Sequence, residues 1–420
     1  LPTPMGRRRG GQMNCWHCGG SGHSQRDCQA LSAGQVKKCF VCGGTDHLAP
    51  NCEQNPNKAE LHSQQEETPW PRTKKVITGS VDPETCQQRM SVLITTSPVP
   101  SNPSTMMLEA VLASFPRVAG LQDCPIVIVC DGFRICEKKS TWKAGKVTED
   151  AADRYAAYLT NLEQLLASGK LPATTTIVML EGRNGQAFAV KAGLEYVRSP
   201  YVCVHQHDLE FMFDFDLNRV LDVLDASDNP VKYVGMPLFV NLNYEDIAFT
   251  HHGLRVAPAT FNGVQLVPIV FWYDSTHITS VQHYTELVFG DASAYQPGNF
   301  VEETFGVRQR ADIMEQGMNG HARYGTYHCL SYGRDGLRRP LICHLNGVRF
   351  LTPEQRAERG YPADPPVEFF PSRVMLNRRH RRLRTILDSV LRFADLGDTV
   401  ESSARDVLAH VLNKTRFNQS

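Results

Sequence analysis

The sequence predicts an α/β domain with a Rossmann-like, mostly parallel sheet and helices on both faces, preceded by two small zinc modules and followed by a helical tail. Two observations carry this prediction. From residue 76 onward short β-branched runs alternate with segments of helical spacing, and before residue 54 one pattern of cysteine and histidine occurs twice. We therefore expect zinc modules over residues 12–53, a linker over 54–75, the α/β domain over 76–366 and a basic helical tail over 367–420.

The two N-terminal motifs have the spacing of four-ligand zinc sites. Each reads Cys-x2-Cys-x4-His-x4-Cys, and a chance repeat of this spacing is very rare. The Cys-x2-Cys turn brings two thiolates to one ion, and the Gly-Gly pair that follows lets the backbone turn tightly. Because four protein ligands close the site, both ions are expected to be structural. The expected Zn²⁺ ligands are Cys15, Cys18, His23 and Cys28 in the first motif and Cys39, Cys42, His47 and Cys52 in the second.

These motifs resemble the zinc knuckles of retroviral nucleocapsid proteins and cellular RNA-binding proteins. In that family an aromatic residue after the first cysteine stacks on an unpaired base, which implies this role for Trp16 and Phe40. The resemblance makes single-stranded RNA or DNA the expected partner, and phosphate contacts are expected from Arg26, Lys37 and Lys38. The alternative is that the knuckles bind protein or only stiffen the N-terminal region.

Composition limits the partners and the compartment. Lys+Arg and Asp+Glu both number 44, so no global attraction to nucleic acid or membrane is expected. Seven of the 13 cysteines lie outside the zinc motifs, and an odd, scattered set is no disulfide framework. Zinc-binding thiolates need a reducing compartment, which predicts a cytoplasmic or nuclear protein. No run of 18 apolar residues occurs, so no membrane partner is expected, and the start at Leu1 suggests a fragment.

The α/β domain is predicted from strands and helices that alternate along the chain. Short β-branched runs bounded by turn residues predict buried strands, and longer segments between them have helical spacing. The expected strands are Ser91–Thr96, Pro125–Cys130, Thr176–Leu180 and Tyr201–His205, and the expected helices are Met106–Ser114, Glu149–Ser168 and Gln186–Val197. After Pro230 the pattern loosens into two strand-like pieces, Tyr233–Leu242 and Leu266–Tyr273.

Polar motifs follow the ends of these strands. The second strand ends at Asp131-Gly132, Arg183-Asn184 precedes the helix that contains Lys191, and the fourth strand runs into Gln206-His207-Asp208. In open α/β sheets, ligands bind beyond the carboxyl ends of the parallel strands. The order of these motifs from about residue 91 to residue 350 resembles that of glycosyltransferases with the GT-A fold, and the family 2-like group is the most similar in character.

The resemblance implies a nucleotide-sugar donor as substrate. It places Asp131 against the nucleoside, and Arg183, Asn184 and Lys191 in the segment that faces the sugar donor. An ordinary Asp-Gly turn and a plain helix start are the competing explanations for the same residues.

The resemblance also implies a catalytic cation. Gln206-His207-Asp208 stands where GT-A enzymes carry the metal-binding Asp-x-Asp, and His344 stands where several families return a histidine to the metal. Since one carboxylate remains, Mn²⁺, which accepts imidazole, is expected over Mg²⁺. Asp208 and His344 are the expected ligands and His207 a third candidate, while a hydrogen-bonded core histidine is the competing explanation for His344.

Glu302 and Glu303 form an acidic pair where inverting family 2-like enzymes carry their general base. The resemblance implies that Glu303 removes the acceptor proton, with Glu302 as the second choice. An acidic helix start, favoured by the helix dipole, explains the pair equally well.

Two functions therefore follow from the sequence. The leading hypothesis is a metal-dependent, inverting glycosyltransferase whose acceptor is nucleic acid or a nucleic-acid-associated molecule delivered by the knuckles. The alternative is a non-catalytic nucleic-acid-binding protein built on a degenerate transferase scaffold. A basic cluster between Arg378 and Arg384 is either a further nucleic-acid contact or a solvated helix face.

Overall fold

The structure is a computed structural model that describes residues 71–82, 88–227, 230–345 and 347–358. The zinc motifs, the predicted linker up to Trp70 and the predicted tail over 367–420 lie outside the described residues. The chain divides after Trp70, so the α/β unit that begins at Pro71 is described by itself.

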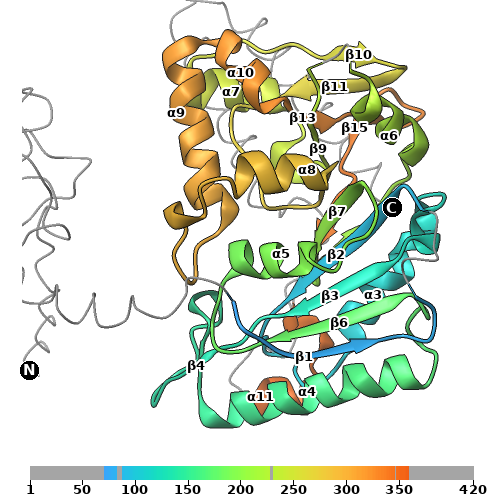
Figure 1. Cartoon of the computed structure of the whole chain (residues 1–420), viewed down its shortest axis with the longest axis vertical. Coiled ribbons are helices and arrows are strands. Elements are labelled where there is room, and N and C mark those ends of the chain that lie inside the picture. Colours follow the sequence, from blue (N-terminus) through green and yellow to red (C-terminus); the bar gives the residue numbers. More distant parts are fainter. Residues whose placement is uncertain (1–70, 83–87, 228–229, 346, 359–420) are drawn as a thin grey trace, which may run out of the picture. The chain divides into compact units, whose positions relative to one another are not determined.

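Within the described residues, the main sheet has ten strands in the order β1-β6-β3-β2-β7-β12-β9-β13-β11-β10 (Figure 1). Its N-terminal half consists of β1 Thr73–Thr78, β2 Met90–Thr96, β3 Ile126–Cys130, β6 Thr175–Leu180 and β7 Tyr201–Gln206. Its C-terminal half consists of β9 Tyr233–Gly235, β10 Ala259–Phe261, β11 Val264–Pro268, β12 His277–Ser280 and β13 Thr326–Cys329.

The core of the sheet is parallel, which confirms the predicted fold class. Neighbouring strands β6, β3, β2 and β7 all run in one direction. Every residue of β2, β3 and β6 is buried, as the continuous β-branched runs predict for strands covered on both faces. The later half adds antiparallel partners, because β12 pairs with both β7 and β9, while β13 runs parallel to β9.

Helices cover both faces of the parallel strands (Figure 1). On one face α3 (Met106–Ser114) and α4 (Glu149–Ala167) contribute to a core that includes Ile94, Ile128 and Ile177. On the other face α5 (Gln186–Leu194) packs against Leu93 and Val129. Alternate strand residues therefore enter opposite cores, as the period of a strand requires. The remaining described α-helices are α6 Leu217–Asp225, α7 Tyr244–His252, α8 Val281–His283, α9 Val307–Gln316, α10 Met318–Tyr324 and α11 Pro353–Glu358.

Several predicted boundaries are wrong. β1 begins at Thr73, inside the predicted linker, because it pairs with β6 at the sheet edge. The strand predicted over Tyr233–Leu242 ends at Gly235, and a 3₁₀ turn occupies Phe239–Asn241. The strand predicted over Leu266–Tyr273 ends at Pro268, and the carbonyl of the next residue, Ile269, accepts from the side chains of Thr326 and Gln309. The α5 helix ends at Leu194 and not at Val197, because the chain turns there through a hydrogen bond from Tyr196 N to Gly193 O.

The described helices and cysteines agree with two sequence expectations. None of the described helices combines the length and the apolar character needed to cross a bilayer. The six cysteines in the described part of the chain are all free thiols, namely Cys124, Cys130, Cys136, Cys203, Cys329 and Cys343.

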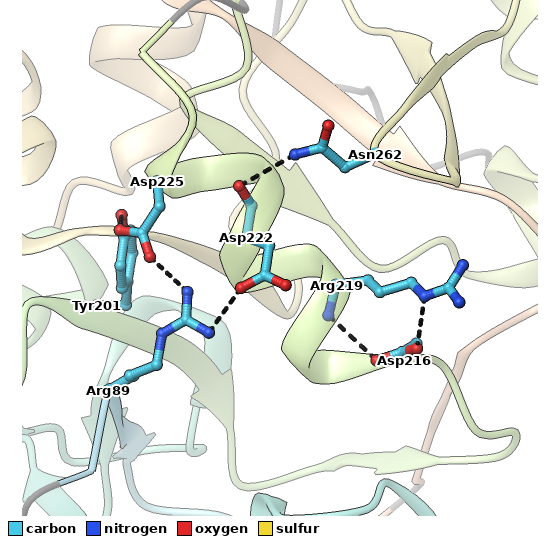
Figure 2. A network of polar contacts seen from close by, with 7 residues as sticks. All are labelled: Arg89, Tyr201, Asp216, Arg219, Asp222, Asp225 and Asn262. Atoms are coloured by element: carbon cyan, nitrogen blue, oxygen red, sulfur yellow. Dashed lines mark hydrogen bonds and ion pairs between the residues drawn. The ribbon is translucent and has the colours of Figure 1, made fainter.

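A polar network joins the N-terminal ends of β2 and β7 to α6 (Figure 2). Arg89, directly before β2, donates to Asp222 at 2.8 Å and also pairs with Asp225. The Tyr201 hydroxyl donates to Asp225 as well. That hydrogen bond and the Arg89 guanidinium hold the pKa of Asp225 below its usual range. Three segments far apart in sequence are thus held together at this edge.

We predict that Arg89→Met lowers the free energy of unfolding at pH 7 by about 0.5–1 kcal/mol, because the ion pairs of the network are largely solvent-exposed. The folded-state pKa of Asp225 is depressed, so this stabilisation is present above the unfolded pKa and is lost as pH falls through the folded value. Urea unfolding of wild type and variant at a series of pH values measures it.

Arg219→Met is the matched control, because Arg219 pairs with Asp216, the N-cap residue of the same helix (Figure 2). It should leave stability nearly unchanged. An Arg89→Met effect that stays constant from pH 7 downward, or an equal loss in Arg219→Met, would contradict this account of the network.

Candidate functional site

A cleft of about 740 Å³, open solvent included, lies at the carboxyl ends of the parallel strands. Thr95 and Thr96 at the end of β2, Asp131 after β3 and Gln206 at the end of β7 contribute to its wall. The cleft therefore lies where ligands bind in open α/β sheets, beyond the carboxyl ends of the parallel strands.

Asp131 organises the loop that precedes α5. Its Oδ1 atom accepts hydrogen bonds from the backbone N–H groups of Gly132 and Asn184, both at 2.9 Å, and from Asn184 Nδ2 at 3.2 Å. Its Oδ2 atom accepts from Gly185 N at 2.9 Å. Burial raises the pKa of this carboxyl, and the four N–H donors oppose that effect by stabilising the charged form. The Asp131 side chain thus holds the loop before α5 in place, whether or not it also contacts a ligand.

The same loop lies directly against the segment that leads to the acidic pair. Gly298 N donates to Asn184 O at 2.6 Å, and Ala187 N donates to Asn299 O at 3.1 Å. Gly185, at φ +85°, passes so close to Gly298 that a Cβ atom there would lie 2.5 Å from the Gly298 Cα atom. Only glycine fits this approach. The two loops therefore form one continuous wall of the cleft.

Arg183 lies in the cleft, whereas two other predicted donor-binding residues do not line it. The Arg183 guanidinium donates to Gly298 O at 3.4 Å and lines the cleft beside Gly145. The Asn184 side chain is used inside its own loop, where it donates to Glu181 O and Gly182 O. Lys191 is absent from the cleft lining, and its ammonium lies over the Phe289 ring at 5.7 Å from the ring centroid.

Asp208 and His344 meet because two short strands pair. β8 (Leu209–Phe211) begins directly after Asp208, and β16 (Ile342–His344) runs antiparallel to it with His344 opposite Leu209. Leu345 N donates to Asp208 O at 2.6 Å and extends this ladder. The result places His344 Nε2 3.1 Å from Asp208 Oδ2. The predicted pair is thus brought together, although its members lie far apart in sequence.

Asp208 is poised as an anion. Burial alone would raise its pKa, but the hydrogen bond from His344 helps to outweigh burial, so the pKa of Asp208 lies below its usual range. The Asp208 side chain is 22% exposed and that of His344 56% exposed, so a ligand can reach both. A carboxylate and an imidazole side by side at the rim of the cleft form a small donor set for a cation.

His207 is held in a different way. Burial lowers the pKa of His207, so its ring is neutral. Its Nδ1 atom accepts a hydrogen bond from Ser97 N at 3.3 Å. A neutral ring that accepts at Nδ1 carries its proton on Nε2 and is there a hydrogen-bond donor. In this arrangement His207 can donate a hydrogen bond to a ligand through Nε2–H. Neither ring nitrogen then has a free lone pair for a metal ion, because the Nδ1 lone pair accepts from Ser97 N.

The Asp208–His344 pair could hold a divalent cation as two of its ligands once the cation displaces the proton that His344 Nε2 donates to Asp208. Adjacent ligands of an octahedral ion with bonds of about 2.1 Å are about 3 Å apart, close to the 3.1 Å that separates the two donor atoms. Within the described ranges, no group of three or more His, Cys, Asp and Glu side chains is arranged to hold a metal ion. Phosphate and water oxygens would have to complete the shell.

The acidic pair lies next to the cleft without lining it. Glu303 is exposed, and its Oε2 atom accepts from Phe300 N at 3.3 Å, while Phe300 itself lines the cleft. Glu302 exchanges hydrogen bonds with Asp274, since Asp274 N donates to Glu302 Oε2 and Glu302 N donates to Asp274 Oδ2. Gln206 Nε2 then donates to Asp274 O at 2.9 Å. A chain of hydrogen bonds therefore connects the cleft floor to Glu302.

Asp274 and Trp142 are site residues that the sequence did not reveal. Asp274 is 2% exposed, and burial together with the charge of Glu302 raises its pKa well above the usual range, which favours its neutral form. Trp142 lines the cleft from a 3₁₀ turn, η6, at Trp142–Ala144. Neither residue belongs to a recognisable motif, and only their positions in the fold identify them.

Comparison with known proteins confirms the first zinc motif. Residues 13–30 match the zinc knuckle family of CCHC type. The second motif, residues 39–52, repeats the same spacing and stays a prediction from sequence. No curated protein matches the sequence of this chain.

The similar solved structures are glycosyltransferases. A mannosyltransferase from Pyrobaculum calidifontis in complex with GDP-Man and Mn²⁺ has 12% identity and a TM-score of 0.31, with 61% of this chain and 59% of that chain covered. TarS 1–349 from S. aureus has 15% identity and a TM-score of 0.31, with 53% and 55% covered. Glucosyl-3-phosphoglycerate synthase from Mycobacterium tuberculosis has 13% identity and a TM-score of 0.29, with 66% and 82% covered. This chain thus spans less than two thirds of the first two, and likeness at this level assigns it no donor or acceptor.

Proposed function

We propose that the α/β unit transfers a sugar from a nucleotide-sugar donor to an acceptor with inversion and with the help of a divalent cation. The observation that carries the proposal is the position of the Asp208–His344 pair. It lies at the same edge of the parallel strands as the loop that Asp131 holds. A buried anchor for a ligand-binding loop and a cation-binding pair at one cleft are what a nucleoside diphosphate requires.

The chain's own residues bind and orient the donor. The cleft offers the hydroxyls of Thr95 and Ser97 and the guanidinium of Arg183, all of which can donate to phosphate or sugar oxygens. His207 Nε2–H adds a donor from a neutral ring. Because these groups stand on strand ends and on a loop fixed by Asp131, they keep their positions without a bound ligand.

Asp208 and His344 would hold the cation, and Mn²⁺ suits this mixed oxygen and nitrogen pair better than Mg²⁺. When bound, a divalent cation neutralises the negative charge that develops on the departing nucleoside diphosphate. Arg183, whose guanidinium lies in the same cleft, would add positive charge from the protein itself.

The acidic pair would supply the general base. Glu303 is the preferred candidate because its carboxylate is exposed and lies against Phe300, a residue of the cleft wall. Glu302 is bound to the backbone of Asp274 and faces a buried neutral acid. A base at this position takes the proton of the acceptor as its oxygen attacks the anomeric carbon, and the bond to the nucleoside diphosphate breaks in the same step.

The first prediction from the proposed function concerns the cation. Wild-type protein should show a thermal shift with at least one nucleoside diphosphate, larger with Mn²⁺ than without, because binding to the folded state stabilises it. Asp208→Ala and His344→Ala should remove the Mn²⁺-dependent part of the shift. His251→Ala, an exposed histidine on α7, serves as the control. If wild type responds to no nucleoside diphosphate, the chain is better explained as a non-catalytic scaffold.

The second prediction separates the two carboxylates. Glu303→Gln should lower the turnover of the accepted nucleotide sugar by about 100-fold or more, the usual contribution of a general base. Its affinity for the nucleoside diphosphate should stay unchanged. Glu302→Gln should have a smaller effect, and Glu315→Gln on α9 serves as an exposed acidic control. A larger loss in Glu302→Gln would move the base to that residue, and normal turnover in both variants would exclude the pair.

The knuckles would bring the transferase to single-stranded RNA or DNA, or to a molecule bound to it. This part of the proposal rests on the zinc knuckle match at residues 13–30 and on the repeated ligand spacing that follows it. Each motif has an aromatic residue, Trp16 or Phe40, directly after its first cysteine, where a base can stack. These residues lie outside the described part of the chain.

The third prediction tests this stacking. The double variant Trp16→Ala, Phe40→Ala should bind single-stranded oligonucleotide at least about 10-fold more weakly, since each stacked base contributes about 1–3 kcal/mol. Trp70→Ala controls for the loss of an aromatic outside the motifs, and zinc content shows that the knuckles keep their ions. Unchanged affinity in the double variant would remove nucleic acid from the proposal.

A further inference from the structure

Trp142 occupies an insertion between β3 and α4 that is built around two very short strands. β4 (Arg134–Ile135) and β5 (Lys146–Val147) flank the η6 turn that carries the indole. Backbone hydrogen bonds close this insertion, from Arg134 N to Gly145 O at 2.9 Å and from Thr141 N to Lys146 O at 2.7 Å. These hydrogen bonds therefore hold the backbone of the insertion that carries Trp142.

The surroundings of Trp142 explain its orientation. It is half-buried and packs against a small apolar cluster of Val147, Ala151 and Ala152 at the start of α4. It also lines the cleft, in company with Asp131 and Gly132. An aromatic ring that is supported by apolar residues and borders a polar cleft can offer a face to a flat ligand.

The insertion is also packed against the donor side of the cleft. Gly145, three residues after Trp142, lies so close to Arg183 that a Cβ atom there would be 2.6 Å from the Arg183 side chain. Arg183 in turn reaches Gly298 O. Gly145 of the insertion therefore lies beside Arg183, and both residues line the cleft together with Trp142 and Asp131.

Besides the His207 imidazole, the cleft lining has two aromatic side chains, Trp142 and Phe300, and these two lie in different segments. Phe300 precedes the acidic pair, whereas Trp142 is bordered by the Asp131 loop. The end of β2 carries Thr95, Thr96 and Ser97 and offers no aromatic face. A flat base that enters beside Asp131 would therefore find its stacking surface on the insertion.

We propose that Trp142 is the residue on which the nucleobase of the donor stacks, so that the β4–η6–β5 insertion forms the base subsite of the cleft. This inference rests on the proposed function. Every nucleobase presents a π-face, so stacking on Trp142 adds affinity without selecting a base. Nucleoside diphosphates with different bases should all depend on Trp142.

The test compares ligands with and without a base on the full chain in the presence of Mn²⁺. Isothermal titration would use UDP, GDP, ADP and, as the probe that lacks a base, inorganic pyrophosphate. Trp142→Ala should weaken the nucleoside diphosphates that wild type binds by about 5- to 100-fold, the range expected for one stacked base. Pyrophosphate affinity should stay within twofold of wild type.

Two further variants keep the test decisive if Trp142→Ala folds poorly. Trp142→Leu keeps an apolar contact with Val147 but has no π-face, so it should lose affinity as Trp142→Ala does. Trp142→Phe should retain most of the affinity. Equal nucleoside diphosphate affinity in wild type and Trp142→Leu, or an equal loss of pyrophosphate affinity, would overturn the stacking role and leave the proposed transferase intact. Failure of wild type to bind any nucleoside diphosphate would instead overturn the transferase itself.

Discussion

The site depends on the buried carboxylate of Asp131. Four N–H groups converge on it, and two of them come from Asn184, more than fifty residues further along the chain. Because an unpaired buried carboxylate is costly, these bonds fix the loop before α5 in one conformation. That loop lies directly against Gly298, through the close approach of Gly185 and the hydrogen bond from Gly298 N to Asn184 O. It therefore positions the start of the segment that leads to Glu302 and Glu303. This one side chain thus connects the end of β3 to the loop before α5 and, through that loop, to the segment at Gly298.

The proposed cation-binding pair of Asp208 and His344 follows a different principle. Where the GT-A resemblance implies two aspartates in one short motif, this chain has a single aspartate and recruits His344 through the pairing of β8 with β16. The pair is therefore assembled by tertiary structure, and its integrity depends on strands of only three residues each. The buried His207 beside it has its Nδ1 atom occupied by Ser97 N–H, so an apparent third ligand is better explained as a proton donor in the cleft.

The sequence predicted the parallel core well and the rest of the sheet poorly, for a physical reason. Runs such as those of β2 and β3 are buried on both faces, and continuous β-branched sequence is the direct consequence of that burial. In the later half, β9 and β12 have three and four residues, too short for a periodic pattern. Their pairing is decided by contacts with distant strands, which a single sequence does not display.

The same distinction applies to the candidate site. Asp131, Arg183 and Asp208 line the cleft, and the sequence singled them out because each follows the end of a strand or precedes a helix in a recognisable order; their contacts with nucleoside, donor and metal stay predictions. Lys191 was predicted from its place after the loop, but α5 directs its ammonium to the Phe289 ring. Trp142 was missed because a single tryptophan in a polar insertion has no sequence signature. Asp274 was missed because its significance lies in its contact with Glu302 across the fold.

Hydrogen exchange of the full chain, with and without a nucleoside diphosphate and Mn²⁺, tests the central claim most directly, since ligand contact slows amide exchange where it stabilises the backbone. The account predicts added protection in the strand-end segment 95–97, in the loop 182–186 and in 206–208, all of which border the cleft. Protection elsewhere with these three segments unchanged, or no change at all, would contradict a nucleotide site at the carboxyl ends of the parallel strands.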